Sequence, residues 1–392
     1  MNRFKNLLPF RQANLWLGKG FILYLLIHLS ACQPPEPVTQ KEAKPPTREE
    51  LDSRLTLNNA TLEQANAQGQ TLWKIQVNKA NYSKDKKTAQ LEKVKGNLYQ
   101  DGKVVLHISS DKGLIQEDGK KIFLNENITA TDPRNGVVIR GDEVEWRPQE
   151  NVFMIRKNLR GTHAKLQASA KEGRYYTKQQ RFELVGDILA TVKEPALQLK
   201  TSFLAWDIKN QFISGDQPLT IVRFKDKTIT DEISAKAVLA NLKDGVATLQ
   251  NDVQYKSFDP PVQIATNQIS WNYKARLLAA NSPVKIFQYK ENITVTGNRA
   301  NVDLNQKMTI LSEGVQSINQ SQPSKLYSNQ LAWNMDSQMV EASGNVIYEQ
   351  EQPKMNFTGE RAVGIIKDNS LFLNGNTSDR VVTEIYPEEK KQ

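Results

Sequence analysis

Residues 326–348 read LYSNQLAWNMDSQMVEASGNVIY, and this stretch contains the signals that decide the fold. Apolar and polar side chains alternate on either side of a short polar step, which is the period of a half-buried β-strand. Leu326 and Leu331 are five residues apart. Side chains of a strand alternate between its faces, so an odd offset moves the apolar set to the other face unless the backbone bends or bulges. The stretch therefore predicts a bent strand with its apolar side chains on the inside of the bend.

The same pattern recurs with a period of about 31 residues, which lies in the range of repeat architectures. A polar step followed by an alternating segment is found ten times at nearly constant intervals. The last large or apolar positions of the ten copies are Tyr82, Ile115, Trp146, Tyr175, Trp206, Ala240, Trp271, Val302, Trp333 and Gly364. In most copies a residue type that tolerates left-handed backbone follows at the distance that separates Trp146 from Asn158: Asn127, Asn158, Asp187, Asp252, Gly314, Asn345 and Asn376. Such a repeat indicates a stack of similar units.

The repeat predicts an all-β fold without helices. Each copy holds two extended segments and the same five-residue offset, as from Ile139 to Val144 and from Ile264 to Ile269. Bends stacked in register would fold a long antiparallel meander into two facing sheets with their apolar sides inwards. We expect a long antiparallel bent-strand jelly roll of about ten strand-bend-strand repeats, with an open edge at each end.

A domain boundary is predicted near the middle of the chain. The repeat is irregular from Gly215 to Asp231, where the turn Gly215-Asp216-Gln217-Pro218 occurs and where the interval between landmarks, from Trp206 to Ala240, is the longest of the series. This gives one jelly-roll domain at residues 51–215, a second at 216–386 and a charged tail at 387–392. Lobes of this size are ordinary domains, and they can also stack continuously.

The N-terminal residues predict export and a lipid anchor. A basic region precedes the apolar run Phe21 to Leu29, which is shorter than the roughly 20 residues that span a bilayer and favours a cleaved signal over residues 1–32. The tetrad Leu29-Ser30-Ala31-Cys32 resembles the lipobox of bacterial lipoproteins, which implies acylation of Cys32. A buried thiol and an uncleaved membrane anchor are the alternatives. Residues 33–50 hold five prolines and almost no apolar side chains, so we expect a semi-extended tether.

Composition and motifs argue against nucleic-acid binding and catalysis. The net charge of +9 includes four basic residues of the signal, and no cluster of basic and aromatic residues occurs, so nucleic acid is not an expected partner. His107 and His163 are isolated from other metal-ligating residues. The acidic pairs Asp142/Glu143 and Asp231/Glu232 are expected in solvated bends. Since nucleophile elbows, phosphate loops and dinucleotide fingerprints are also missing, we expect no enzyme, no metal and no cofactor.

The tryptophans at equivalent repeat positions have two interpretations. They are core fillers, or they line a trough between the sheets that accepts an apolar ligand. On the second interpretation the groove candidates are Trp146, Tyr175, Trp206, Trp271, Val302 and Trp333.

An N-terminal signal, a tether and a bent repeat with A-x-W and G-N-V signatures together resemble the lipopolysaccharide-transport bridge family, the LptC/LptA/OstA group. The matching segments are ASGNVIYEQ, YSNQLAWNMDSQ, ATNQISWNYKARL and TGNRANVDLNQKMTILSEGV. The resemblance is of the LptC type, and it implies a jelly roll that shields lipopolysaccharide acyl chains in the periplasm. The lipobox and the length sufficient for two domains depart from the usual membrane-anchored member.

The resemblance also implies partners. We expect lipopolysaccharide, the membrane subunits of a lipopolysaccharide-export ABC transporter, and an LptA- or LptD-like jelly-roll protein of the periplasm or outer membrane. Open strand edges invite pairing with another sheet. The candidate edge residues are Leu55, Leu57, Val381, Val382 and Ile385, and the lipid anchor is expected in the inner membrane. The alternative is a lipid-anchored structural or adhesive β-solenoid that transports nothing; a β-helical carbohydrate enzyme is a distant third.

Overall fold

The structure, a computed structural model, describes residues 55–164, 166–194, 196–259, 261–365, 370–374 and 382–385. The expected signal peptide, Cys32, the tether at 33–50, Asn376, Val381 and the tail at 387–392 lie outside the described residues. These expectations therefore stay predictions.

In the described part of the chain, the regular elements are β-strands and two single-turn 3-10 helices, η1 (Glu117–Gly119) and η2 (Pro148–Glu150). The first strands are β1 (Leu55–Ala65), β2 (Thr71–Tyr82), β3 (Ala89–Gln100), β4 (Lys103–Gln116), β5 (Lys121–Thr131), β6 (Val138–Arg147), β7 (Val152–His163), β8 (Leu166–Tyr176), β9 (Arg181–Val192), β10 (Leu197–Asp207), β11 (Phe212–Gly215), β12 (Leu219–Lys225) and β13 (Thr228–Ala235). The remaining strands are β14 (Ala237–Asn241), β15 (Val246–Phe258), β16 (Pro261–Asn272), β17 (Leu277–Ala280), β18 (Val284–Gln288), β19 (Ile293–Gly297), β20 (Arg299–Asp303), β21 (Met308–Asn319), β22 (Ser324–Asn334), β23 (Met339–Glu351), β24 (Lys354–Ile365), β25 (Ser370–Asn374) and β26 (Val382–Ile385).

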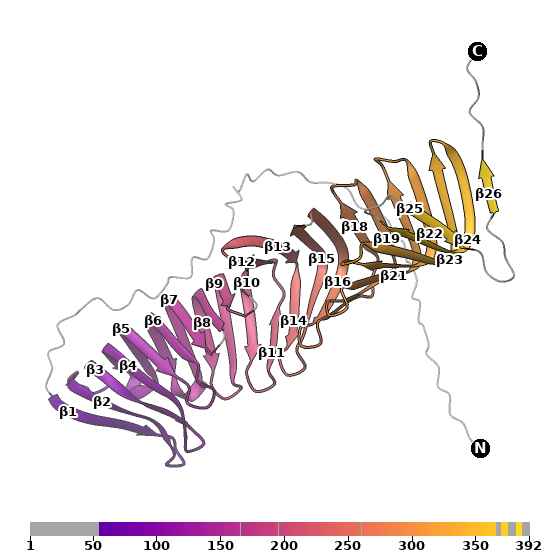
Figure 1. Ribbon diagram of the computed structural model, residues 1–392. Coiled ribbons are helices and arrows are strands. Elements are labelled where there is room, and N and C mark those ends of the chain that lie inside the picture. Colours follow the sequence, from indigo (N-terminus) through magenta and orange to yellow (C-terminus); the bar gives the residue numbers. More distant parts are fainter. Residues whose placement is uncertain are drawn as a thin grey trace, which may run out of the picture. The chain divides into compact units, whose positions relative to one another are not determined.

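The strands form one antiparallel meander, which confirms the predicted all-β class. All 26 described strands belong to one sheet, and each long strand pairs with the strands before and after it in the chain. Figure 1 shows the strands β1 to β10 side by side in chain order, whereas β11 and β12, which both pair with β10, lie one after the other beside it. A repeat contributes two bent strands, one outgoing and one returning, so the sheet bends twice per repeat rather than once.

On the outgoing strands β5, β7, β9, β15, β21 and β23 the bend is a β-bulge built from two left-handed residues. The outgoing strands carry consecutive positive-φ pairs, such as Lys157–Asn158 and Gly344–Asn345, at the point where the pairing register shifts. The other pairs of this kind are Glu126–Asn127, Gly186–Asp187, Asn251–Asp252 and Glu313–Gly314. An extra residue on one strand bends it and reverses the alternation of side chains. The five-residue offset, as from Leu326 to Leu331, lies on the returning strand, and the facing residues Ser317 and Leu311 of the bulged strand are six residues apart.

Two outgoing strands break at the bend instead of bulging. The linkers are residues 216–218 between β11 and β12, and 281–283 between β17 and β18, and each ends in a proline. The turn at Gly215 is thus the bend of its own repeat, and pairing continues across it because β10 pairs with both β11 and β12. Separate domains at 51–215 and 216–386 stay a prediction.

The repeat positions form a single row across the sheet. Starting at Tyr82, each residue of the row is the pairing partner of the next. This tryptophan row is Tyr82, Ala89, Ile115, Ile122, Trp146, Phe153, Tyr175, Phe182, Trp206, Ile213, Ala240, Ala247, Trp271, Leu278, Val302, Thr309, Trp333, Val340 and Gly364. All ten landmarks of the sequence repeat lie in it.

A second row lies on the other side of the bends and faces the same interior. This opposite row is Leu62, Ile75, Gly96, Ile108, Ala130, Ile139, Gly161, Ala168, Ala190, Leu199, Ile221, Ile233, Tyr255, Ile264, Ile286, Val295, Ser317, Leu326, Tyr348 and Phe357. Members of both rows pack into the same hydrophobic clusters. We call the strand segments that carry the two rows the tryptophan arm and the opposite arm.

Polar residues on the outer side of the bends pair with one another. Asn127 donates to Asp111 at 2.6 Å, and Lys171 lies 2.8 Å from Asp187. Each pair joins a left-handed residue to the polar residue on the neighbouring returning strand. The polar step of the sequence repeat is thus the solvated outer side of the bend.

Valine in place of Asn345 is expected to destabilise the fold locally by about 1–2 kcal/mol, because a side chain in the left-handed region clashes with the following carbonyl. Asn345 has φ 50° and is exposed, so packing does not confuse the result. Glycine at the same site should be within about 0.5 kcal/mol of the native protein. Denaturant unfolding of the two variants checks this; equal stability of both would contradict the bulge.

Candidate functional site

The two arms pack tightly together over residues 71–192, which we call the closed segment. One hydrophobic cluster runs from Leu62 to Ile188 and contains residues of both rows. In the tryptophan row every side chain from Ala89 to Phe182 is buried; Trp146 is 4% exposed and Phe153 0%. The interior of this segment is therefore filled by its own side chains.

The two rows of the closed segment differ in side-chain size. The opposite row of the closed segment holds small residues, among them Gly96, Ala130 and Gly161. They accompany bulky residues in the tryptophan row, such as Trp146 and Phe153. A methyl group at Gly96 would come within 2.3 Å of the carbonyl oxygen of Lys74, which lies on the paired strand β2 of the same arm. Alternation of large and small residues across facing positions lets layers interdigitate.

The arms are less tightly packed over residues 197–365, which we call the open segment. The buried clusters there consist of residues next to the bends, such as Val253 and Leu311. Farther from the bends, Trp206, Trp271, Val302 and Trp333 are only partly buried, and so is the opposite row from Leu199 to Phe357. In these residues the opposite row contains no glycine or alanine, and Ser317 is its one small side chain. The open segment thus presents apolar side chains that solvent reaches.

The predicted groove residues are divided between the two segments. Trp146 and Tyr175 are buried in the closed segment, whereas Trp206, Trp271, Val302 and Trp333 lie in the open segment. All six share the tryptophan row. Their role as ligand contacts stays a prediction.

Three tryptophans of the open segment carry unsatisfied donors. Within the described residues, the indole nitrogens of Trp206, Trp271 and Trp333 are buried and lack a hydrogen-bond partner. A buried donor without a partner costs about 1–3 kcal/mol. Consecutive members of this set are four strands apart, or roughly 19 Å at the spacing of strands in a sheet.

A polar latch holds the arms of the closed segment together. Tyr175 of the tryptophan arm donates to the carboxylate of Asp132 at 2.8 Å, and Arg134 donates to the Tyr175 hydroxyl at 2.6 Å. Asp132 and Arg134 lie in the turn that ends the opposite arm between β5 and β6, and they also form an ion pair. Burial raises the pKa of the Tyr175 hydroxyl, so it stays a neutral donor. Burial also opposes ionisation of Asp132, but hydrogen bonds from Arg134 and Tyr175 outweigh it and lower the pKa of this carboxyl.

A second contact between the arms lies at the end of the closed segment. The ring of His163, at the end of β7, meets Trp206 edge to face with ring centroids 5.9 Å apart. In the sequence, His163 is isolated from other metal-ligating residues. In the structure its ring packs against Trp206. For residues 219–353 the described hydrogen bonds, ion pairs and ring contacts stay within one arm or within the bends.

The expectation for Asp231 was wrong. It does not lie in a solvated bend: it is buried in β13 and accepts hydrogen bonds from Tyr255 and Arg223. Burial alone would raise the pKa of Asp231, but its hydrogen bonds lower it. Asp142 and Glu143, in contrast, lie at a bend as expected and pair with Asn158 and Lys157.

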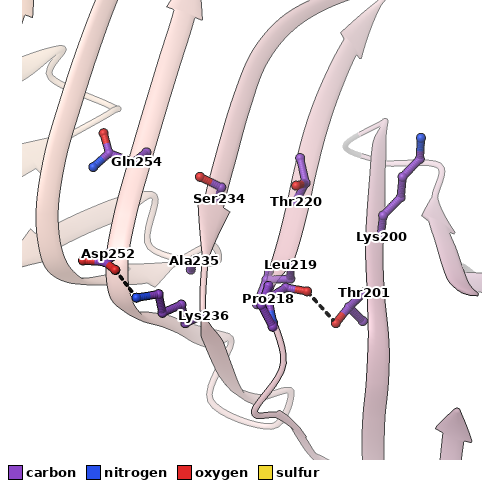
Figure 2. Close-up of a pocket in the computed structure, with 10 residues that line it drawn as sticks. All are labelled: Lys200, Thr201, Pro218, Leu219, Thr220, Ser234, Ala235, Lys236, Asp252 and Gln254. Atoms are coloured by element: carbon purple, nitrogen blue, oxygen red, sulfur yellow. Dashed lines mark hydrogen bonds and ion pairs between the residues drawn. The ribbon is translucent and has the colours of Figure 1, made fainter. Parts of the chain in front are cut away.

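Two depressions lie on the outer face of the opposite arm. Figure 2 shows one of about 560 Å³, where Lys200, Thr220, Ser234 and Gln254 project from neighbouring strands. Its bend residues are already paired: Thr201 donates to the Pro218 carbonyl at 3.0 Å, and Lys236 forms an ion pair with Asp252. The other, of about 590 Å³, includes His107, which is bonded to Asn97 at 2.7 Å. No group of residues that could hold a metal ion occurs in the described part of the chain.

The two ends of the sheet expose strand edges. Within the described residues β1 pairs with β2 alone, and β26 pairs with β24 alone. Leu55 is exposed at the β1 edge, while Leu57 packs against the core. Val382 and Ile385 lie in β26 opposite Thr358 and Met355.

The chain belongs to the LptC-related lipopolysaccharide-assembly family. The family model matches it twice, over residues 21–154 and 138–257, and these matches together cover more than half of the 392 residues. Membership of this family points to a periplasmic component of the lipopolysaccharide-transport bridge. No helix among the described residues has the length and apolarity to cross a membrane.

The solved structures that resemble this chain include LptH, the LptA homologous periplasmic component of the conserved lipopolysaccharide transport device from Pseudomonas aeruginosa. It is 14% identical, with a TM-score of 0.22, and the match covers 40% of this chain and 95% of that one. Among curated proteins, none matches the sequence.

Proposed function

We propose that this protein is a membrane-anchored bridge component that receives lipopolysaccharide from an inner-membrane ABC transporter and passes it towards the outer membrane. The observation that carries the proposal is the partly exposed apolar interior of the open segment, in a chain of the LptC-related family. Each methylene buried there would contribute roughly 0.8 kcal/mol. The acylated Cys32 would hold the chain on the periplasmic side of the inner membrane, with residues 33–50 as tether.

The free strand edges support handover between partners. β1 has the sequence LTLNNATLEQA, with one charged residue and no proline, and such an edge pairs readily with another sheet. Leu55 and Leu57 would dock one partner, and Val381, Val382 and Ile385 the other. The transporter subunits and an LptA- or LptD-like jelly roll are the proposed partners, with two jelly-roll domains, 51–215 and 216–386, between them.

The interior is proposed to bind lipid without changing it chemically. The carboxylates of Asp132 and Asp231 are engaged by arginine and tyrosine side chains, and the acidic residues at bends are paired. The rival is a structural β-solenoid with a filled interior. The packing of the closed segment alone would fit it, but the open segment favours transport.

Photo-crosslinking in the presence of lipopolysaccharide tests the proposal. A photoreactive residue at Trp333, on the inner face, should capture lipopolysaccharide. The matched control is Ala332, the preceding residue of β22, which points to the outer face and should capture none. Equal capture at both positions, or capture at Ala332 only, would rule out an inner lipid site.

A further inference from the structure

We propose that lipopolysaccharide acyl chains occupy the open segment alone, and that the contact of His163 with Trp206 marks the end of their site. This inference rests on the proposed function and divides the tryptophan row between two roles. The interior of residues 71–192 would be filled by its own side chains and exclude lipid. The interior of residues 197–365 would hold the lipid.

The first argument is accessibility. An acyl chain gains free energy by covering apolar surface that water otherwise reaches. Trp271, Val302 and Trp333 offer such surface, whereas Trp146, Phe153 and Tyr175 do not. A chain that entered the closed segment would have to separate packed side chains and break the hydrogen bonds of Tyr175.

The second argument is the pattern of side-chain size within the open segment. Between Trp206 and Trp271 the tryptophan row holds Ile213, Ala240 and Ala247. The two alanines are partly exposed, so the side chains of the row are small between the bulky indoles of Trp206 and Trp271. The roughly 19 Å between consecutive tryptophans is on the scale of a fatty acyl chain.

The third argument is hydrogen bonding. The indole donors without a partner belong to Trp206, Trp271 and Trp333, the three tryptophans of the open segment's row. Acyl chains of lipopolysaccharide carry ester and amide oxygens, which accept hydrogen bonds. A small rotation of an indole would let such an oxygen satisfy its N–H and remove the cost of leaving it unpaired.

Crosslinking along the row, in the full-length protein with purified lipopolysaccharide, tests the division. Photoreactive residues at Trp271 and Val302 should capture lipid at least ten times more strongly than those at Phe153 and Phe182. Comparable capture in both segments would overturn the division and leave the proposed function standing. Absence of capture at every inner position of folded variants would instead contradict the proposed function.

A second variant avoids disturbing the closed core. Ala247→Trp places a bulky side chain where the row has small ones and should weaken lipopolysaccharide binding at least tenfold. Ala332→Trp on the outer face should leave binding unchanged. Circular dichroism of both variants confirms folding. Undiminished binding by folded Ala247→Trp would place the lipid elsewhere and refute the inference.

Discussion

Replacing Phe153 by alanine should lower the free energy of unfolding of the closed segment by about 3–5 kcal/mol, the usual cost of truncating a fully buried aromatic side chain. Phe153 is 0% exposed and lies between Trp146 and Tyr175 in the tryptophan row. Stacked repeats contact mainly their neighbours, so the loss should be local. Hydrogen exchange resolved by peptide would show faster exchange in residues 121–192 and little change beyond residue 260.

The matched control is Phe357→Ala in the open segment. Phe357 is partly exposed and packs beside Tyr348, so truncation should cost about 1–2 kcal/mol. Equal costs at the two phenylalanines would mean that the segments do not differ in packing. A uniform rise of exchange along the whole chain would instead show that the sheet unfolds as one unit.

Asp132→Asn should cost about 2–4 kcal/mol at neutral pH, because it removes a buried carboxylate from Arg134 and Tyr175. The Asp132 side chain is 3% exposed, and that of Arg134 28%. The pKa of Asp132 is lowered in the folded protein from 3.8, so its charge stabilises the fold at pH values above the unfolded pKa. That contribution is lost as the pH falls through the folded pKa.

The stability difference between wild type and Asp132→Asn should therefore be constant from pH 7 to about pH 5 and shrink below about pH 4. Urea unfolding followed at several pH values measures it. Asp207→Asn, at the partly exposed end of β10, is the control and should change stability by less than about 1 kcal/mol. A difference that grows as the pH falls would show that Asp132 is not held ionised by the latch.

The sequence repeat predicted the fold in detail because its signals are local. The odd offset from Leu326 to Leu331 predicts a bend from the two-residue period of a strand alone. Asn345 predicts a left-handed position from its residue type alone. Both appear in the structure where they were expected. All ten landmark positions lie in one row because each repeat adds two strands of matching length.

One local signal was overlooked. Three of the four tryptophans in the tryptophan row are followed by Asp or Asn, in Trp206–Asp207, Trp271–Asn272 and Trp333–Asn334, whereas Trp146 is followed by Arg147. The Asp and Asn side chains accept hydrogen bonds from backbone N–H groups two or three residues later, at 2.9–3.2 Å, and so close the turns. Asp and Asn favour such turns, so the dipeptide could have located these ends of the strands.

The open and closed segments could not have been predicted repeat by repeat. Gly96, Ala130 and Gly161 belong to different copies, and only the pairing register brings them into one row. Burial of Asp231 depends on Tyr255, which lies 24 residues away in the chain. Both features are properties of contacts between repeats, which no single repeat contains.

Because strand pairing is unbroken from β1 to β24, the length of this sheet is set by its number of repeats. Each repeat adds two strands, or roughly 10 Å of reach at the usual strand spacing. Loss or gain of a whole repeat keeps every side chain on its face, whereas an odd change in strand length would turn the apolar set outwards. The distance that such a protein spans can therefore change in evolution only by whole steps of about this size.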